Sequence, residues 1–151
     1  MSHFAALERE LRTFSRRSQT QRATVSAIAH PYLDPETYSL LAYFSAHPGA
    51  SGSDVASHFH VGRATISRQL SRVAELGLID RQMDPDDSRG QIINLTEFGR
   101  DQLERAMAAR AELLSEILSD WSDTDVHVLA ELMGRYLRSF SRWRSAQSDA
   151  V

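Results

Sequence analysis

The chain has 151 residues, a formal net charge of −3 and no cysteine. Its apolar content of 42% is near the globular average, which argues against general disorder. Without cysteine, a disulfide framework, a thiol redox switch and a cysteine-based metal site are excluded. No apolar run approaches the roughly 18–20 residues of a membrane span, and the N-terminus lacks a signal-peptide pattern. We therefore expect a cytoplasmic protein with no membrane partner.

The charge is unevenly distributed along the chain. Residues 1–30 hold five arginines and two glutamates, whereas residues 97–131 hold nine acidic residues and three arginines. A negative total does not exclude a nucleic-acid ligand, because binding depends on where the positive groups lie. All the basic residues are arginines. Either a GC-rich coding bias or a preference for phosphate contacts would explain why arginine replaces lysine throughout.

The N-terminal part predicts two helices. An amphipathic first helix is indicated by apolar residues at spacings of i, i+3, i+7 and i+10, namely Phe4, Leu7, Leu11 and Phe14. Asp34 is placed to cap a second helix, with Pro35 at its first position. That helix continues through "YSLLAYFSA" and ends at "HPGAS".

The next segment predicts two helices joined by a tight turn. Ser51, followed three residues later by Asp54, is a variant of the capping box and begins the short helix "GSDVASHF". After "HVG", a further helix runs to Gly77. Its apolar residues recur at i, i+4 and i+7 and are expected to pack into a core: Ile66, Leu70 and Val73. Arg68 and Arg72 project from roughly the opposite side.

A hairpin and two more helices complete the prediction. "LIDRQM" and "QIINL" have strand patterns, and "DPDDSRG" between them is dense in turn formers. A long helix is predicted from Thr96 to Trp121, and Ser122 is expected to cap a last helix with a broad apolar stripe. The first helix and the last two present more apolar surface than the small middle can cover. We expect this surface to be buried against another chain.

These elements predict a mostly α fold with a small β wing. A helix-turn-helix followed by a hairpin forms a winged lobe, and the terminal helices form a dimerisation region. The expected boundaries are residues 1–33 for an N-terminal helix that contributes to dimerisation, residues 34–98 for the winged DNA-binding lobe, and residues 99–151 for the C-terminal dimerisation helices.

Residues 38–99 resemble the MarR family of winged-helix transcriptional regulators. The most specific match is "DPDDSRGQIINLTEFG", which fits the family pattern D-P-x-D-x-R, then L-T, then x-x-G. The resemblance implies a homodimer on a pseudo-palindromic operator, with the recognition helix in the major groove and the wing tip in the minor groove. Two departures are His60, where the family often has glycine, and Gly62, where it often has serine.

Position by position, the resemblance assigns DNA contacts to four helix residues and one wing residue: Arg63, Thr65, Ser67, Arg68 and Arg89. Asp87 matches the acid that orients the wing arginine. Arg68 lies one turn into its helix and can bind guanine O6 and N7 through both ends of its guanidinium. Arg72, a turn later, is expected to meet the DNA backbone. The alternative for Arg68 and Arg72 is a solvated face with i, i+4 partners.

The resemblance also implies a small-molecule effector, aromatic or phenolic, near the first, second and fifth helices. The candidate lining residues are Arg16, His30, Tyr38 and Tyr43. The alternative for His30 is an ordinary loop histidine. We expect a DNA-binding repressor that such a molecule releases, and the main rival is a winged-helix protein-interaction module without specific DNA binding.

Other chemistry finds little support. Asp84, Asp86 and Asp87 lack the central glycine and closing glutamate of a calcium loop, so turn formation and pairing with Arg81 or Arg89 are expected. His58 and His60 lack an evident third zinc ligand. "GASGS" lacks the closing glycine and the preceding strand of a nucleophile elbow. We expect no metal, no cofactor and no enzymatic activity.

Overall fold

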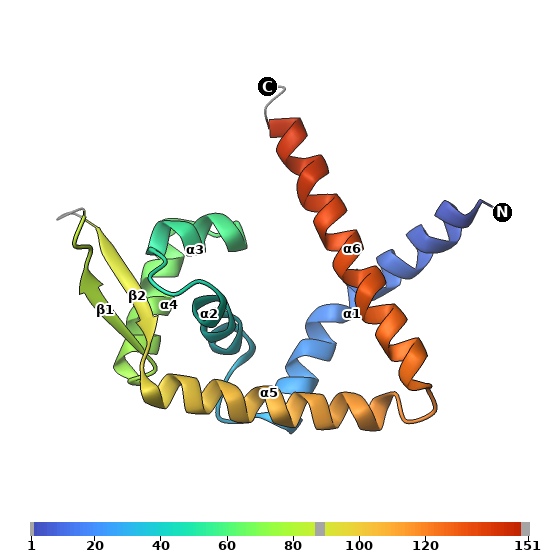
Figure 1. Ribbon diagram of the computed structural model, residues 1–151, viewed down its shortest axis with the longest axis horizontal. Coiled ribbons are helices and arrows are strands. Elements are labelled where there is room, and N and C mark those ends of the chain that lie inside the picture. The colour runs from blue at the N-terminus through green and yellow to red at the C-terminus, as the bar shows by residue number, and fades with distance from the viewer. Residues whose placement is uncertain (1, 87–89, 149–151) are drawn as a thin grey trace. The chain divides into compact units, whose positions relative to one another are not determined.

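The computed structural model describes residues 2–86 and 90–148, and Figure 1 shows its elements. The chain folds into two compact units, residues 1–113 and residues 114–151. The predicted fold class, mostly α with a small β wing, is confirmed. In chain order the elements are α1 (His3–Ala29), α2 (Pro35–Ala46), α3 (Gly52–Phe59), α4 (Arg63–Glu75), β1 (Ile79–Met83), β2 (Gln91–Leu95), α5 (Glu97–Ile117) and α6 (Asp123–Ser148).

The predicted helix starts are confirmed by their caps. Asp34 Oδ1 accepts the backbone N–H of Thr37 at 2.9 Å, with Pro35 in the first turn of α2. Ser51 and Asp54 form a reciprocal capping box, because each side chain accepts the other residue's backbone N–H. Hydrogen bonds from Ser51 hold the pKa of Asp54 below its usual value. Ser122 makes the same reciprocal pair with the residue three positions on.

The core lies in the first unit, where α2, α3, α4, the hairpin and the first half of α5 meet. Its fully buried side chains include Leu41, Phe44, Val55 and Val73, each no more than 1% exposed. These residues come from three helices, so the core fixes the helix-turn-helix as one body with α2. The remaining apolar core residues are Leu33, Leu40, Ala56, Ile66, Leu70, Leu78, Ile79, Ile93, Leu95, Leu103 and Ala106.

The predicted hairpin is present, and a bridge that the sequence did not predict extends it. β1 and β2 pair antiparallel, with Ile79 opposite Leu95. The backbone N–H of Asp84 donates to the carbonyl of Gly90 at 3.0 Å and closes the ladder at its outer end. Ala50, just before α3, forms an isolated antiparallel bridge with β2. This bridge ties the helix-turn-helix to the wing.

One predicted boundary is wrong. α5 ends at Ile117, four residues before the predicted Trp121, and the chain then turns, with the N–H of Trp121 donating to Leu118 O at 2.9 Å. Ser119 and Asp120 lie in this turn. Such short polar side chains compete for backbone hydrogen bonds and favour turns and caps over helix interiors.

The second unit presents a long apolar face that its own residues do not bury. No described side chain of α6 is buried. The large apolar side chains that α6 leaves exposed are Val126, Val128, Leu129, Leu132, Met133, Tyr136, Leu137, Phe140 and Trp143.

Among the described residues, no helix is long and apolar enough to cross a membrane.

Candidate nucleic-acid interface

The turn before α4 has an unusual backbone conformation at one residue. His60 adopts the left-handed conformation (φ 54°, ψ 42°), which histidine tolerates less readily than glycine. The N–H of Val61 then donates to Ala56 O at 3.1 Å, and Gly62 is the N-cap of α4 with no side-chain cap. The N–H of Thr65 donates to Gly62 O at 3.0 Å, so the amides that the missing side-chain cap leaves for an external acceptor are those of Arg63 and Ala64.

α4 has one buried and one exposed face, as predicted. Ile66, Leu70 and Val73 are no more than 4% exposed and belong to the core. Arg63, Ser67 and Arg68 are exposed on the other side, whereas Thr65 is half-buried. Three of the four helix contacts that the resemblance predicts are therefore exposed on α4, and Thr65 is partly covered.

A groove of about 340 Å³ separates α4 from the hairpin and the start of α3. Arg63 and Arg81 both line it, so it carries two cations. Arg81 Nη2 lies 3.4 Å from Ser71 Oγ, and its buried Nε has no hydrogen-bond partner among the described residues. A phosphate oxygen suits such guanidinium groups.

From the sequence, Arg81 was expected to pair with the acidic residues of the wing tip. Its place in the groove beside α4 was not predicted. In the hairpin register Arg81 lies opposite the buried Ile93, so the two side chains share the face that turns toward α4. The alternation of "LIDRQM" could have indicated this face, but only with the pairing register known.

Arg72 pairs with a residue of another helix rather than with an i, i+4 neighbour. Its Nη2 lies 3.0 Å from Oδ2 of Asp34, the N-cap of α2, and so connects α4 to another helix. Burial alone would raise the pKa of Asp34. Hydrogen bonds from the N–H and hydroxyl of Thr37, together with the charge of Arg72, outweigh burial and lower the pKa.

Replacing Asp34 by asparagine is expected to lower the free energy of unfolding by about 0.5–1 kcal/mol near neutral pH. Asparagine still caps α2 but loses the charge that faces Arg72 and the helix N-terminus. Because the folded-state pKa is lowered, this stabilisation is present above the unfolded value, about 3.9, and is lost as the pH falls below it. Urea titrations at a series of pH values measure it, and a difference between the two proteins that persists undiminished in acid contradicts the assignment.

The winged lobe matches a model of the MarR family over residues 33–90. This segment runs from the loop before α2 to the wing and contains every predicted DNA-contact residue. Over this segment the chain is similar to the MarR family.

The chain is also similar to transcriptional regulators of known sequence or structure. The chain is 28% identical to the HTH-type transcriptional regulator YxaD of Bacillus subtilis, over 89% of this chain and 92% of that one. It is 25% identical to the HTH-type transcriptional repressor IacR of Pseudomonas putida, over 67% of this chain and 60% of that one. The crystal structure of the PcaV regulator from Streptomyces coelicolor with its natural ligand superposes with a TM-score of 0.66, at 24% identity, over 83% of this chain and 89% of that one.

The wing residues expected from the MarR-family resemblance, Asp87 and Arg89, lie outside the described residues. At the described edge of the wing, the N–H of Asp86 donates to Asp84 Oδ1 at 2.9 Å. This hydrogen bond is the turn-forming role predicted for the acidic cluster.

The four predicted effector residues lie in different surroundings. His30 is fully buried at the C-cap of α1, where Nδ1 lies 3.0 Å from Leu33 O. Its ring stacks on Tyr38 at 4.9 Å, and Arg110 of α5 lies over the Tyr38 ring. His30 therefore lies in the connection after α1, as the alternative expected, but it is buried there.

The other two predicted effector residues lie apart from this pair. Tyr43 stacks on His47 at 4.4 Å and lies 4.7 Å from the ring of His58, in a second aromatic cluster. Arg16 is exposed on α1. The structure thus brings together two of the four residues.

Within the described residues, no group of three or more histidine, aspartate or glutamate side chains is arranged to hold a metal ion.

Proposed function

We propose that this protein is a homodimeric, sequence-specific DNA-binding repressor that a small molecule releases. The observation that carries the proposal is the outward face of α4, where Arg63, Ser67 and Arg68 are exposed while the opposite face packs into the core. A helix with this arrangement fits the major groove of B-DNA. The same residues on a solvated helix of a protein-interaction module would have no reason to gather beside an uncapped N-terminus.

Arg68 is the proposed base-reading residue. It lies one turn into α4 and is exposed, so its guanidinium can donate to O6 and N7 of one guanine. Thr65 and Ser67 are short enough to let the helix approach the base edges. Arg63 and Arg81 line the groove beside the hairpin and are proposed to bind phosphate, and Arg89 on the wing is proposed to enter the minor groove with Asp87 orienting it.

The unburied apolar faces support a dimer. α1 leaves Phe4, Leu7 and Phe14 about half exposed or more, and α6 leaves a longer stripe. Burying such surface against a second copy stabilises the assembly. We propose residues 1–33 and 99–151 as the dimerisation region and residues 34–98 as the DNA-binding lobe. A two-fold axis then presents two α4 helices to successive major grooves, about 34–36 Å apart, on a pseudo-palindromic operator.

Repression and release are supported by what related proteins do. IacR is a repressor, and PcaV was crystallised with its natural ligand. We propose a small aromatic or phenolic effector for this chain, with Arg16, His30, Tyr38 and Tyr43 as the candidate contacts inferred from the sequence. A ligand shifts the DNA-binding equilibrium only through its different affinity for the two conformations.

Replacing Arg68 by alanine is expected to weaken binding to the DNA that flanks the protein's own gene. The loss of one bidentate contact corresponds to about 1–3 kcal/mol, or roughly 5–150-fold in affinity per half-site. Electrophoretic mobility shift measures the dissociation constant, and Arg105→Ala on α5, which removes another exposed arginine, serves as the matched control. Equal affinity of wild type and Arg68→Ala would remove Arg68 from the interface.

A further inference from the structure

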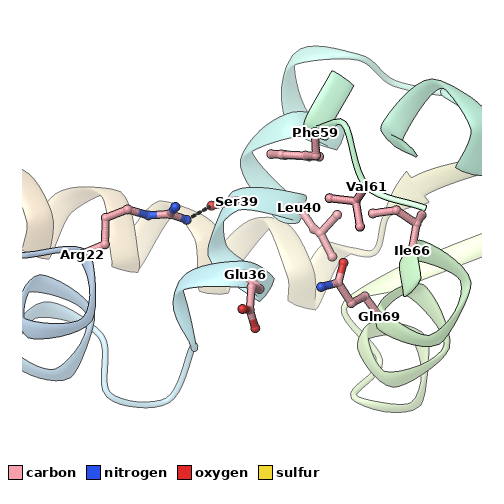
Figure 2. A pocket seen from close by; sticks show the side chains of 8 residues that line it. All are labelled: Arg22, Glu36, Ser39, Leu40, Phe59, Val61, Ile66 and Gln69. Carbon is pink, nitrogen blue, oxygen red and sulfur yellow. Dashed lines mark hydrogen bonds between the residues drawn. The ribbon is translucent and has the colours of Figure 1, made fainter. Parts of the chain in front are cut away.

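A pocket of about 260 Å³ lies directly behind α4, and none of the predicted effector residues lines it. Figure 2 shows that side chains from α1, α2, the end of α3, the following turn and α4 converge on this space. Pockets for drug-sized ligands measure about 300–1,000 Å³, so this pocket suits a smaller molecule.

One end of the pocket is apolar. Leu40 and Ile66 are core residues that expose only an edge, Phe59 is half-buried, and Val61 in the turn is 36% exposed. In Figure 2 these four side chains gather where α2 meets the α3–α4 turn. An apolar ring placed against them would remove apolar surface from water, which favours binding.

The other lining groups are polar and their charges cancel. Arg22 Nη2 of α1 donates to Ser39 Oγ at 3.2 Å, and Ser39 Oγ in turn donates to Pro35 O at 2.7 Å. Glu36 supplies a carboxylate and Gln69 of α4 an amide. A ligand would therefore meet both hydrogen-bond donors and acceptors. A cationic ligand would face the charge of Arg22, and an anionic ligand would face the charge of Glu36.

We propose that this pocket binds a small, uncharged, single-ring molecule with a group that both donates and accepts hydrogen bonds, such as a primary amide. The ring would lie against Phe59 and Val61, and the polar group would lie among Arg22, Glu36 and Gln69. This pocket is a separate place for a ligand, at the seam between α2 and α4, and it shares no residue with the effector contacts inferred from the sequence.

Occupation of this pocket is expected to shift α4, and this part of the proposal rests on the proposed function. Ile66 and Gln69 lie one turn apart on α4 and flank Arg68. A smaller cavity of about 20 Å³ continues along the same seam and is lined by both members of the Asp34–Arg72 ion pair. A ligand that separates the pocket walls would therefore shift α4 relative to α2 and weaken DNA binding.

The binding half is tested without DNA, by saturation-transfer NMR on the full-length protein. Benzamide is the probe, and benzoate and benzylamine are ring-matched anionic and cationic probes. Benzamide is expected to bind with a dissociation constant of about 1 mM, and the charged probes at least about fivefold more weakly. Equal affinity of the three probes, tighter binding of a charged probe, or no binding of benzamide overturns the proposal.

A variant pair locates the site. Val61→Phe fills the pocket from an exposed turn position and is expected to weaken benzamide binding at least about tenfold. Leu76→Phe, an exposed apolar position outside the pocket, is the matched control and is expected to leave benzamide affinity unchanged. Unchanged benzamide affinity in Val61→Phe, with its thermal midpoint like that of wild type, overturns the assignment to this pocket.

The regulatory half is tested by DNA affinity with and without saturating benzamide. A decrease of at least about threefold in wild type, absent in Val61→Phe, supports it. Benzamide binding at the pocket with unaltered DNA affinity overturns it. Absence of DNA binding in both conditions overturns the proposed function instead, while the direct binding measurements still decide the pocket.

Discussion

The affinity of the dimer for its operator is expected to fall by about a thousandfold between about 50 and 200 mM salt. Each protomer offers Arg63, Arg81 and a wing arginine to phosphates or the minor groove, so the dimer would neutralise about six phosphates. Each neutralised phosphate releases condensed counterions, and this release becomes less favourable as the salt concentration rises. Fluorescence anisotropy with labelled operator DNA measures the slope of log affinity against log salt.

A charge-removing variant ties this slope to named residues. Arg63→Gln should reduce the magnitude of the slope by about two, one for each protomer, because it removes one phosphate contact from each half-site. Arg105→Gln, an exposed arginine of α5 that pairs with Asp101, should leave the slope unchanged. A flat salt dependence in wild type would favour the protein-interaction module over the DNA-binding regulator.

Replacing Gly99 by alanine is expected to destabilise the winged lobe by about 3 kcal/mol. A Cβ at this position would overlap the carbonyl oxygen of Leu78 and lie 2.9 Å from its carbonyl carbon. The obstacle is backbone rather than a flexible side chain, so α5 and the start of β1 must separate. Thermal unfolding should show a decrease of roughly 6–12 °C in the midpoint.

The matched control is another glycine with open surroundings. Gly62→Ala places its Cβ where no heavy atom lies within 4 Å, at a backbone angle (φ −61°) that alanine adopts freely. Its stability should stay within about 1 kcal/mol of wild type. If Gly99→Ala unfolds at the wild-type temperature, the close approach of α5 to Leu78 does not exist in solution.

The same close approach explains part of the wing pattern "LTEFG". Thr96 Oγ1 donates to Gly77 O at 2.6 Å and accepts the N–H of Gly99 at 2.9 Å, so this threonine caps α5 and fastens it to the corner after α4. Gly77, with φ of 72°, makes that corner. The pattern could be recognised from the sequence, but its role in holding the hairpin required the structure.

The sequence by itself determined the local features of this protein. Caps and helix starts at Asp34, Ser51 and Ser122 depend on residues three apart, and the buried face of α4 depends on residues three or four apart. Such short-range geometry is contained in the backbone's own periodicity. For this reason the order of the elements and the exposure of Arg68 and Arg72 could be predicted before any coordinates.

Only the tertiary structure decided which side chains from distant segments meet. The ion pair between Arg72 and Asp34 joins positions 38 residues apart, and the pairing of His30 with Arg110 joins positions 80 apart. Arg81 faces α4 only because of the hairpin register. Neither helical period nor composition encodes these distances, because they follow from how the core packs α2, α4 and α5 against one another.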